Sequence, residues 1–341
     1  MPLPLSTGFS IGWQRRRVRV VKSKQLYLGV DCSAYTTSLA LVDQEERLLW
    51  ERRKLLPVPE GGLGLRQSEA VFAHIRSLPG LWEEGAAVLK QAPLAAVAAA
   101  VRPRPCPDSY MPVFKVSQTA GELIARTLAL PFYEYSHQEG HLSAGLWSAA
   151  LPLGRYLAVH LSGGTTELLA VEQQEGGRLE IAARGGGADL HAGQFVDRIG
   201  LALGFSFPAG PALERFARRG KTGAIRLPVA VQGSLISFSG PASQAQRLLE
   251  QGCNHSDLAR AVELCIADSL AAALAAVEDF RGCEGILIVG GVAANSFIRE
   301  RLLQSVSGAP LHFASPEFAG DNAAGLAVLA ARRGEAGAIE I

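Results

Sequence analysis

A pattern of 17 residues occurs twice in this chain, with the two copies 129 positions apart. Residues 27–43 read YLGVDCSAYTTSLALVD, residues 156–172 read YLAVHLSGGTTELLAVE, and eight aligned positions are identical. In each copy a turn of small and hydroxyl residues separates two apolar runs, which is the pattern of a β-hairpin. The same hairpin opening two halves of one chain predicts a duplicated fold. Chance similarity between two strands is the alternative interpretation, but the match includes the turn residues.

The segments that follow each hairpin alternate between strand and helix patterns. Residues 94–101 (LAAVAAAV) predict a buried strand, although their alanines also suit a helix. Residues 116–130 have apolar side chains at helical spacing, and residues 192–204 predict a helix that ends at Gly204. Strand, glycine turn and helix then follow in order over 285–306. This alternation predicts an α/β fold.

The two halves are expected to form separate lobes, because 341 residues exceed one ordinary core. The segment SAALPLG, within residues 145–155, is the expected link between them. We therefore expect an N-terminal lobe over 25–148 and a C-terminal lobe over 149–341, preceded by a basic arm over 1–24. In the second lobe a long helix is predicted over 257–280, capped by Ser256 or Asp257.

The charge of the chain limits how it could bind a nucleic acid. The net charge is +1, so a basic field over the whole molecule is excluded and binding would need a local patch. One patch, WQRRRVRVVKSK at residues 13–24, is either an RNA contact or a solvated arm. The five cysteines form no CxxC pair, which favours a reducing cytoplasm over a disulfide framework. No uncharged apolar run is long enough to predict a membrane helix.

Two glycine loops are candidates for holding a phosphate. In LSGGTTE (161–167) the N–H groups of Gly163 and Gly164, with the Ser162 hydroxyl, could surround one, although a hairpin turn also needs glycine. In VGGVAANS (289–296) a loop follows a buried strand and precedes a helix, as many nucleotide-binding loops do. Asn295 opens that helix, either as its N-cap or as a ligand contact.

A histidine pair in SHQEGH is a candidate metal site. His137 and His141 are four residues apart, so on a helix both would face one way and could share one ion. The alternative is a pair of core histidines that bond to the backbone. A metal would need a third ligand, for which Asp321 in AGDNAAG is the best candidate. Histidine with carboxylate suits iron, zinc or manganese. No catalytic triad and no certain catalytic residue can be identified.

The repeat, both glycine loops, the histidine pair and the late aspartate occur in an order that resembles the TsaD family over roughly residues 25–332. The resemblance implies a duplicated actin/Hsp70-like (ASKHA) fold with two lobes around a nucleotide cleft. It also implies transfer of a threonylcarbamoyl group from its adenylate to N6 of the tRNA adenosine 3′ to the anticodon. The implied cofactor is one divalent metal, iron or zinc.

The resemblance also implies roles for particular residues. His137, His141 and Asp321 correspond to the metal ligands of the family. The implied substrate- or nucleotide-binding residues are His160, Leu161, Ser162, Gly163, Gly164, Asp197, Gly210 and Asn295. Residues 61–81 resemble the region that pairs with a partner subunit. The implied partners are tRNA and protein subunits of a threonylcarbamoylation complex, among them a TsaD-family paralogue.

Several positions differ from the family pattern. SCDET is here SAYTT, so Tyr35 and Thr36 occupy acidic positions, and SGGHT is SGGTT. RGPG is RPRP at 102–105, and FSGLKT is FSGPAS with Ala242 in place of lysine. Two interpretations follow: an enzyme, or a non-catalytic paralogue that binds nucleotide and metal and acts as a scaffold or regulator of the synthase. The three retained metal-ligand residues favour the enzyme.

Overall fold

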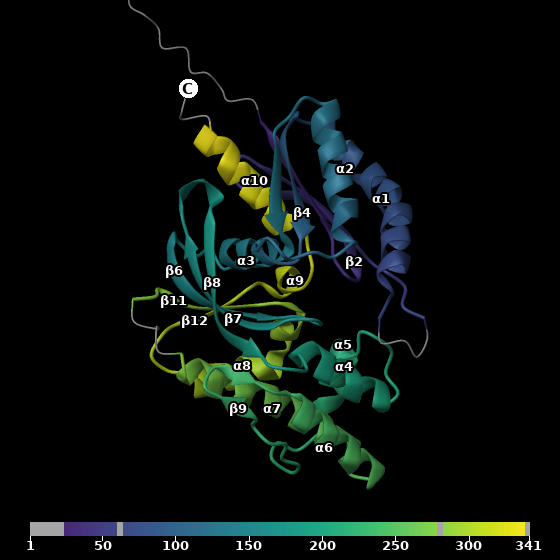
Figure 1. Ribbon diagram of the computed structural model, residues 1–341, viewed down its shortest axis with the longest axis vertical. Helices are drawn as coiled ribbons and strands as arrows, with labels where there is room; N and C mark the ends of the chain where they lie inside the picture. The colour runs from purple at the N-terminus through teal and green to yellow at the C-terminus, as the bar shows by residue number, and fades with distance from the viewer. Residues whose placement is uncertain (1–23, 60–63, 278–281, 338–341) are drawn as a thin grey trace, which may run out of the picture.

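The computed structural model describes residues 24–59, 64–277 and 282–337 and consists of two α/β lobes (Figure 1). Each lobe is built on one twisted β-sheet, and helices cover the sheet faces. Apart from Lys24, the basic arm predicted over 1–24 lies outside the described residues. The predicted link at 145–155 lies between the last turn of the helix that carries the histidine pair and the first strand of the second sheet.

The first sheet contains five strands in the order β3-β2-β1-β4-β5. Their bounds are β1 Leu26–Cys32, β2 Thr36–Asp43, β3 Leu48–Leu55, β4 Leu94–Arg102 and β5 Phe132–Ser136. The first three form an antiparallel meander, whereas β4 and β5 run parallel to β1. The predicted hairpin and the predicted strand at 94–101 are therefore confirmed.

The second sheet repeats this plan and extends it, in the order β12-β11-β6-β7-β8-β10-β9. Its strands are β6 Gly154–Leu161, β7 Thr166–Gln173, β8 Leu179–Gly187, β9 Val231–Gln232, β10 Leu235–Ile236, β11 Gly285–Val289 and β12 Leu311–Phe313. The two hairpins share one register: Cys32 pairs with Thr37, and their equivalents 129 positions later, Leu161 and Thr166, also pair. The duplicated fold predicted from the repeat is confirmed.

Helices cover both faces of the first sheet. Neighbouring residues of β1 point to opposite sides, and all seven are buried, so both faces need a covering layer. Leu28 packs in the cluster that includes residues of α1 (Gln67–Leu89) and α2 (Phe114–Thr127). Tyr27, on the other face, packs with α10 (Ala324–Gly337), and α3 (His137–Ser148) lies against α10. The last helix of the chain thus belongs to the sheet that the first strand begins, as Figure 1 shows.

Glycines allow the backbone of α10 to pack directly against β1 and α3. A Cβ added to Gly29 of β1 would lie 2.2 Å from the backbone oxygen of Ala323. A Cβ added to Gly325 of α10 would lie 2.0 Å from the backbone oxygen of Gly140 in α3. The loop that precedes α10 is held against the end of the first sheet in consequence, and this loop carries Asp321.

The second lobe has most of its helices at the lower end of the view in Figure 1. The remaining helical elements are η1 Glu175–Gly177, α4 Ala192–Ala202, α5 Gly210–Ala217, α6 Ser239–Glu250, α7 His255–Ala275, η2 Gly291–Ala294, α8 Ser296–Ser305 and α9 Pro316–Ala319. Gly204, with φ of +86°, follows the end of α4 as predicted. The cap predicted for α7 is wrong: Asn254 accepts from the N–H groups of Ser256 and Asp257. Those two residues lie inside the first turn, where N–H groups lack intrahelical partners.

Candidate metal centre and nucleotide cleft

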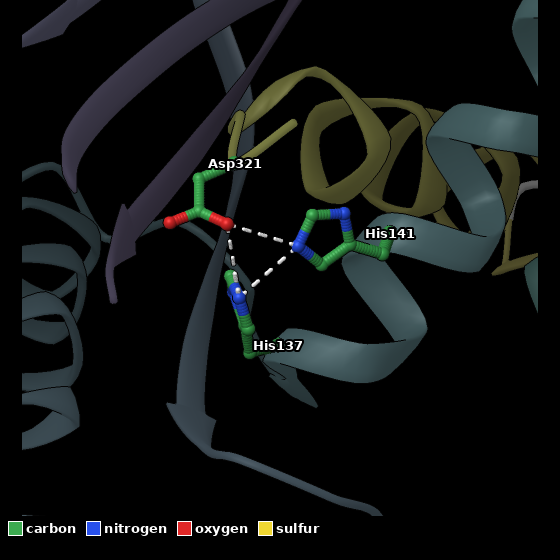
Figure 2. Close-up of side chains that lie close together, drawn as sticks. All are labelled: His137, His141 and Asp321. Carbon is green, nitrogen blue, oxygen red and sulfur yellow. Dashed lines mark hydrogen bonds and ion pairs between the residues drawn. The ribbon is translucent and has the colours of Figure 1, made fainter. Parts of the chain in front are cut away.

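Three potential metal ligands converge where the first turn of α3 meets the loop before α10. His137 and His141 lie one turn apart on α3, and both imidazoles point toward Asp321 (Figure 2). The two Nε2 atoms are 3.1 Å apart, and Asp321 Oδ1 lies 3.1 Å from Nε2 of His141. The ligand atoms of all three residues lie within 4.8 Å of one another. The structure therefore brings together the trio that the sequence predicted.

Two residues at the end of the first hairpin strand hold these ligands from behind. Asp31 Oδ2 accepts a hydrogen bond of 2.7 Å from Nδ1 of His137, which leaves Nε2 of that ring directed at Asp321. Ser33 Oγ donates to Asp321 Oδ2 over 2.5 Å. A carboxylate behind a ligating histidine is a usual outer support of a metal site. Sequence reasoning missed both residues, although both lie in the repeat, at its strand end and turn.

Two carboxylates, those of Asp31 and Asp321, surround His137 and favour a positive charge at this site. Burial opposes a charge on His137, but the Asp31 and Asp321 carboxylates outweigh it and raise the pKa of His137 to about 10. Burial would raise the pKa of Asp321, but hydrogen bonds from His137 and His141 hold it well below its usual value. Without a metal, the His137 ring is therefore protonated, and the charged ring lies between the Asp31 and Asp321 carboxylates. Two imidazole nitrogens and one carboxylate oxygen fit a divalent cation, which would release that proton.

The turn between β6 and β7, residues 162–165, is referred to below as the second turn. Its backbone is open to the cleft, because a Cβ added to Gly163 or Gly164 would meet no atom within 4 Å. The start of α4 supports the turn from behind: a Cβ added to Gly193 would lie 2.5 Å from Gly163 Cα. The second turn therefore offers bare backbone on the cleft side, as a phosphate site requires.

Two adjacent chambers form the cleft: the larger lies between the lobes, whereas residues of the second lobe alone line the inner one. The chamber beside the metal ligands has a volume of about 420 Å³, and an inner chamber has about 290 Å³. Gly163 and Asp197 line both, so the two chambers meet at the second turn. The predicted residues that line one chamber or both are His137, Ser162, Gly163, Gly164, Asp197, Gly210, Asn295 and Asp321.

The other predicted residues lie behind the cleft wall. Leu161 is fully buried in the core of the second lobe. His160 is 3% exposed, and its ring centroid lies 4.7 Å from that of His141. Burial, with the nearby rings of His141 and His137, lowers the pKa of His160 well below its usual value, so its ring is neutral. His160 therefore packs against a metal ligand instead of lining either chamber.

Asn295 and Asp197 are each held by the surrounding backbone. Asn295 caps α8, because its Oδ1 accepts from the Ile298 N–H over 3.0 Å, and its Nδ2 donates to Glu263 over 2.7 Å. The cap, one of the two roles considered for Asn295, is confirmed. Asp197 accepts from the Ala209 N–H over 2.8 Å, and burial raises the pKa of its carboxyl.

Two contacts join the lobes beside the larger chamber, which Tyr35, Phe207 and Pro103 line. The Tyr35 ring, from the first lobe, packs edge-on against Phe207 of the second lobe at 5.1 Å between centroids. Arg104, from the RPRP loop, forms an ion pair of 2.6 Å with Glu167 of β7. Sequence reasoning predicted neither contact. The one signal was that Tyr35 occupies a turn position where the second copy of the repeat has glycine.

Solved structures with the same fold cover nearly the whole chain. The activator of the 2-hydroxyisocaproyl-CoA dehydratase from Clostridium difficile superposes with a TM-score of 0.55 at 12% identity, over 93% of this chain and 98% of its own. T. kodakarensis HypF superposes with a TM-score of 0.58 at 16% identity, over 92% of this chain and 48% of its own. With its duplicated sheets and central cleft, the protein is a two-lobed α/β protein of the ASKHA fold.

Sequence comparison identifies the family. A family model for TsaD, tRNA N6-adenosine threonylcarbamoyltransferase, matches residues 74–328, and the chain therefore belongs to the TsaD family. A relative of that name from Thermus thermophilus is 33% identical over 316 residues, which cover 91% of this chain and 93% of the relative. Another, from Archaeoglobus fulgidus, is 28% identical over 302 residues, 88% of each chain.

Proposed function

We propose that this protein transfers a threonylcarbamoyl group from its adenylate to N6 of the tRNA adenosine 3′ to the anticodon. The observation that carries the proposal is the position of the His137, His141 and Asp321 trio at one end of a cleft that passes over the second turn. An adenylate bound along that cleft would have its nucleoside in the inner chamber and its carbamoyl end beside the trio.

The inner chamber is suited to an adenosine. Apolar side chains such as Val292 and Ile298 line it, and the polar side chains in its wall are those of Asp197, Asn295 and Glu214. The Asp197 carboxylate would accept from ribose hydroxyls, and Asn295 would lie toward the base. At the junction with the larger chamber, the N–H groups of the second turn would hold the phosphate and stabilise negative charge that develops there.

The metal site is suited to the carbamoyl end of the substrate. His137, His141 and Asp321 would hold one divalent cation, iron or zinc, which when bound supplies Lewis-acid and template chemistry. Asp31 and Ser33 would keep two of these ligands oriented. No general base is assigned among the described residues. Because the N6 amine is a weak nucleophile, orientation of the two substrates would supply much of the barrier reduction.

The proposed partners are tRNA and a protein subunit. The outer face of α1 carries Phe72 and Ile75, which are 61% and 55% exposed, and supports the proposal that a partner subunit packs there. The free cysteines fit a reducing cytoplasm. Among the described residues, no helix has the length and apolar character of a membrane span.

A second candidate function is that of a non-catalytic paralogue that binds nucleotide and metal and regulates the synthase. The contacts of Tyr35 with Phe207 and of Arg104 with Glu167 favour it, since both join the two lobes and would hinder opening of the cleft for a tRNA base. In addition, the family resemblance places an acidic residue at the position of Tyr35, so this chain lacks an acidic group that other members carry.

The experiment that separates the two functions is complementation of a strain depleted of its own synthase, scored by mass spectrometry of the modified nucleoside. The enzyme should restore the nucleoside, and His141→Ala should reduce it to background. His255→Ala, a change of an exposed histidine outside the cleft, is the matched control and should leave it unchanged. Failure of the wild-type chain, together with measured binding of AMP and metal, would contradict the enzyme and support the paralogue.

A further inference from the structure

A buried histidine outside the metal site is linked to it by hydrogen bonds. His74 of α1 is fully buried beneath the turn between β1 and β2, residues 33–36, referred to below as the first turn. Its Nε2 lies 2.7 Å from the backbone oxygen of Ser33, and its Nδ1 lies 2.8 Å from Thr37 Oγ1. The function proposed above gives no role to this histidine.

The acceptors and donors around His74 fix its proton. The Ser33 carbonyl can only accept, so His74 Nε2 must carry the hydrogen and donate. Burial lowers the pKa of His74, so its ring is neutral and Nδ1 accepts from the Thr37 hydroxyl. The two bonds therefore run in one direction, from Thr37 through His74 to Ser33.

The Ser33 side chain continues this direction to the metal site. Its Oγ accepts from the Thr36 N–H over 3.2 Å and donates to Asp321 Oδ2 over 2.5 Å, a much shorter bond than its 3.4 Å contact with the Thr36 backbone oxygen. The other oxygen of that carboxylate, Oδ1, is then the one that faces Nε2 of His141. The Asp321 side chain is 25% exposed to the cleft, so it has room to turn when this bond is absent.

We propose that Ser33 and His74 are positioning residues of the metal centre, with His74 fixing the first turn and the Ser33 hydroxyl fixing the ligand oxygen of Asp321. The inference rests on the metal centre proposed above and assigns roles to two residues outside the ligand trio. The supporting chain of bonds is continuous, every member has its hydrogen assigned, and Ser33 and His74 are at most 3% exposed.

The test measures Co²⁺ affinity of the purified full chain by competition with a chromophoric chelator, together with the visible absorption of bound Co²⁺. Ser33→Ala should weaken Co²⁺ binding about 10–100-fold, the usual effect of losing an outer support of a metal ligand. The matched control is Ser117→Ala, which removes a fully buried hydroxyl of the same lobe whose 2.5 Å bond goes to the Ala100 backbone oxygen. The control should bind Co²⁺ as the wild type does.

A double-mutant cycle tests the part played by His74. His74→Phe should weaken Co²⁺ binding less than Ser33→Ala, and the two changes together should cost no more than Ser33→Ala alone, because His74 acts through Ser33. If His74→Phe does not fold, Thr37→Val replaces it in the cycle, because it removes the donor to His74 with little change in side-chain volume. The same non-additive result is expected. Additive losses would overturn the role of His74.

The outcomes also separate this inference from the proposed function. If the wild-type chain binds no Co²⁺, the metal centre itself is wrong, and this inference falls with it. If the wild type binds Co²⁺ and Ser33→Ala binds it as tightly as Ser117→Ala does, only the positioning role is overturned.

Discussion

The two turns of the repeat share one backbone hydrogen bond but present different groups to their surroundings. In the first turn the Ser33 N–H donates to the Thr36 oxygen over 3.0 Å, and in the second the Ser162 N–H donates to the Thr165 oxygen over 2.9 Å. The first turn directs the Ser33 side chain at Asp321, one of the proposed metal ligands. The second presents glycine backbone to the cleft. The two turns are thus equivalent scaffolds, of which the first supports the proposed metal centre and the second the proposed phosphate site.

The residues that flank the turns show the same division. The threonine after each turn ties it to a helix: Thr37 contacts His74 of α1, and Thr166 accepts from the Ala192 N–H at the start of α4. At the strand ends, Asp31 in the first copy is equivalent to His160 in the second. Asp31 bonds to His137, whereas neither ring nitrogen of His160 has a hydrogen-bond partner within the described residues.

The largest expected difference between the copies concerns this strand-end pair. Asp31→Ala removes the acceptor behind His137, so Co²⁺ affinity measured by chelator competition should fall about 10–100-fold. His160→Leu, at the equivalent position, should change it far less, because no hydrogen bond from a ligand is lost. Equal losses in the two variants would show that the strand ends do not differ in function.

A smaller effect is expected from filling the two turns. Gly163→Val would put a side chain where the second turn faces the cleft, and AMP affinity by calorimetry should fall about tenfold. The melting temperature should barely change, since an added Cβ at Gly163 meets no atom within 4 Å. Ala34→Val, at the equivalent position of the first turn, should leave AMP affinity nearly unchanged. The reverse ranking would contradict a phosphate site at the second turn.

The smallest effect should come from making the first turn resemble the second. Tyr35→Gly copies the residue at position 164 and removes the contact with Phe207, an aromatic pair worth about 0.5–1.5 kcal/mol beyond its buried area. AMP should then dissociate a few-fold faster in stopped-flow measurements. Tyr35→Phe keeps the ring and is the control. Slower release from Tyr35→Gly would argue against closure of the cleft by this ring.

The repeat allowed the duplicated sheets to be predicted because apolar alternation and turn residues are local signals. The convergence of the trio was also predictable, since His137 and His141 lie on one helical face and Asp321 was the best candidate for a third ligand, as the family resemblance also implies. The roles of Asp31 and Ser33 could not be predicted, because they depend on how the first hairpin meets α3 and the loop before α10. Similarly, nothing local distinguishes Asn254, Ser256 and Asp257 as caps, since all three are good N-cap residues.

The position of α10 has a consequence for how the protein is made. The first lobe begins with β1, yet the face of β1 that includes Gly29 is covered by residues near the end of the chain. A ribosome synthesises the N-terminal part first and at about 5–20 residues per second. The apolar face of that sheet therefore remains uncovered until residues 321–337 have left the ribosome. The second lobe can fold before the first, and the same late segment carries Asp321, so the proposed metal centre is among the last features to form.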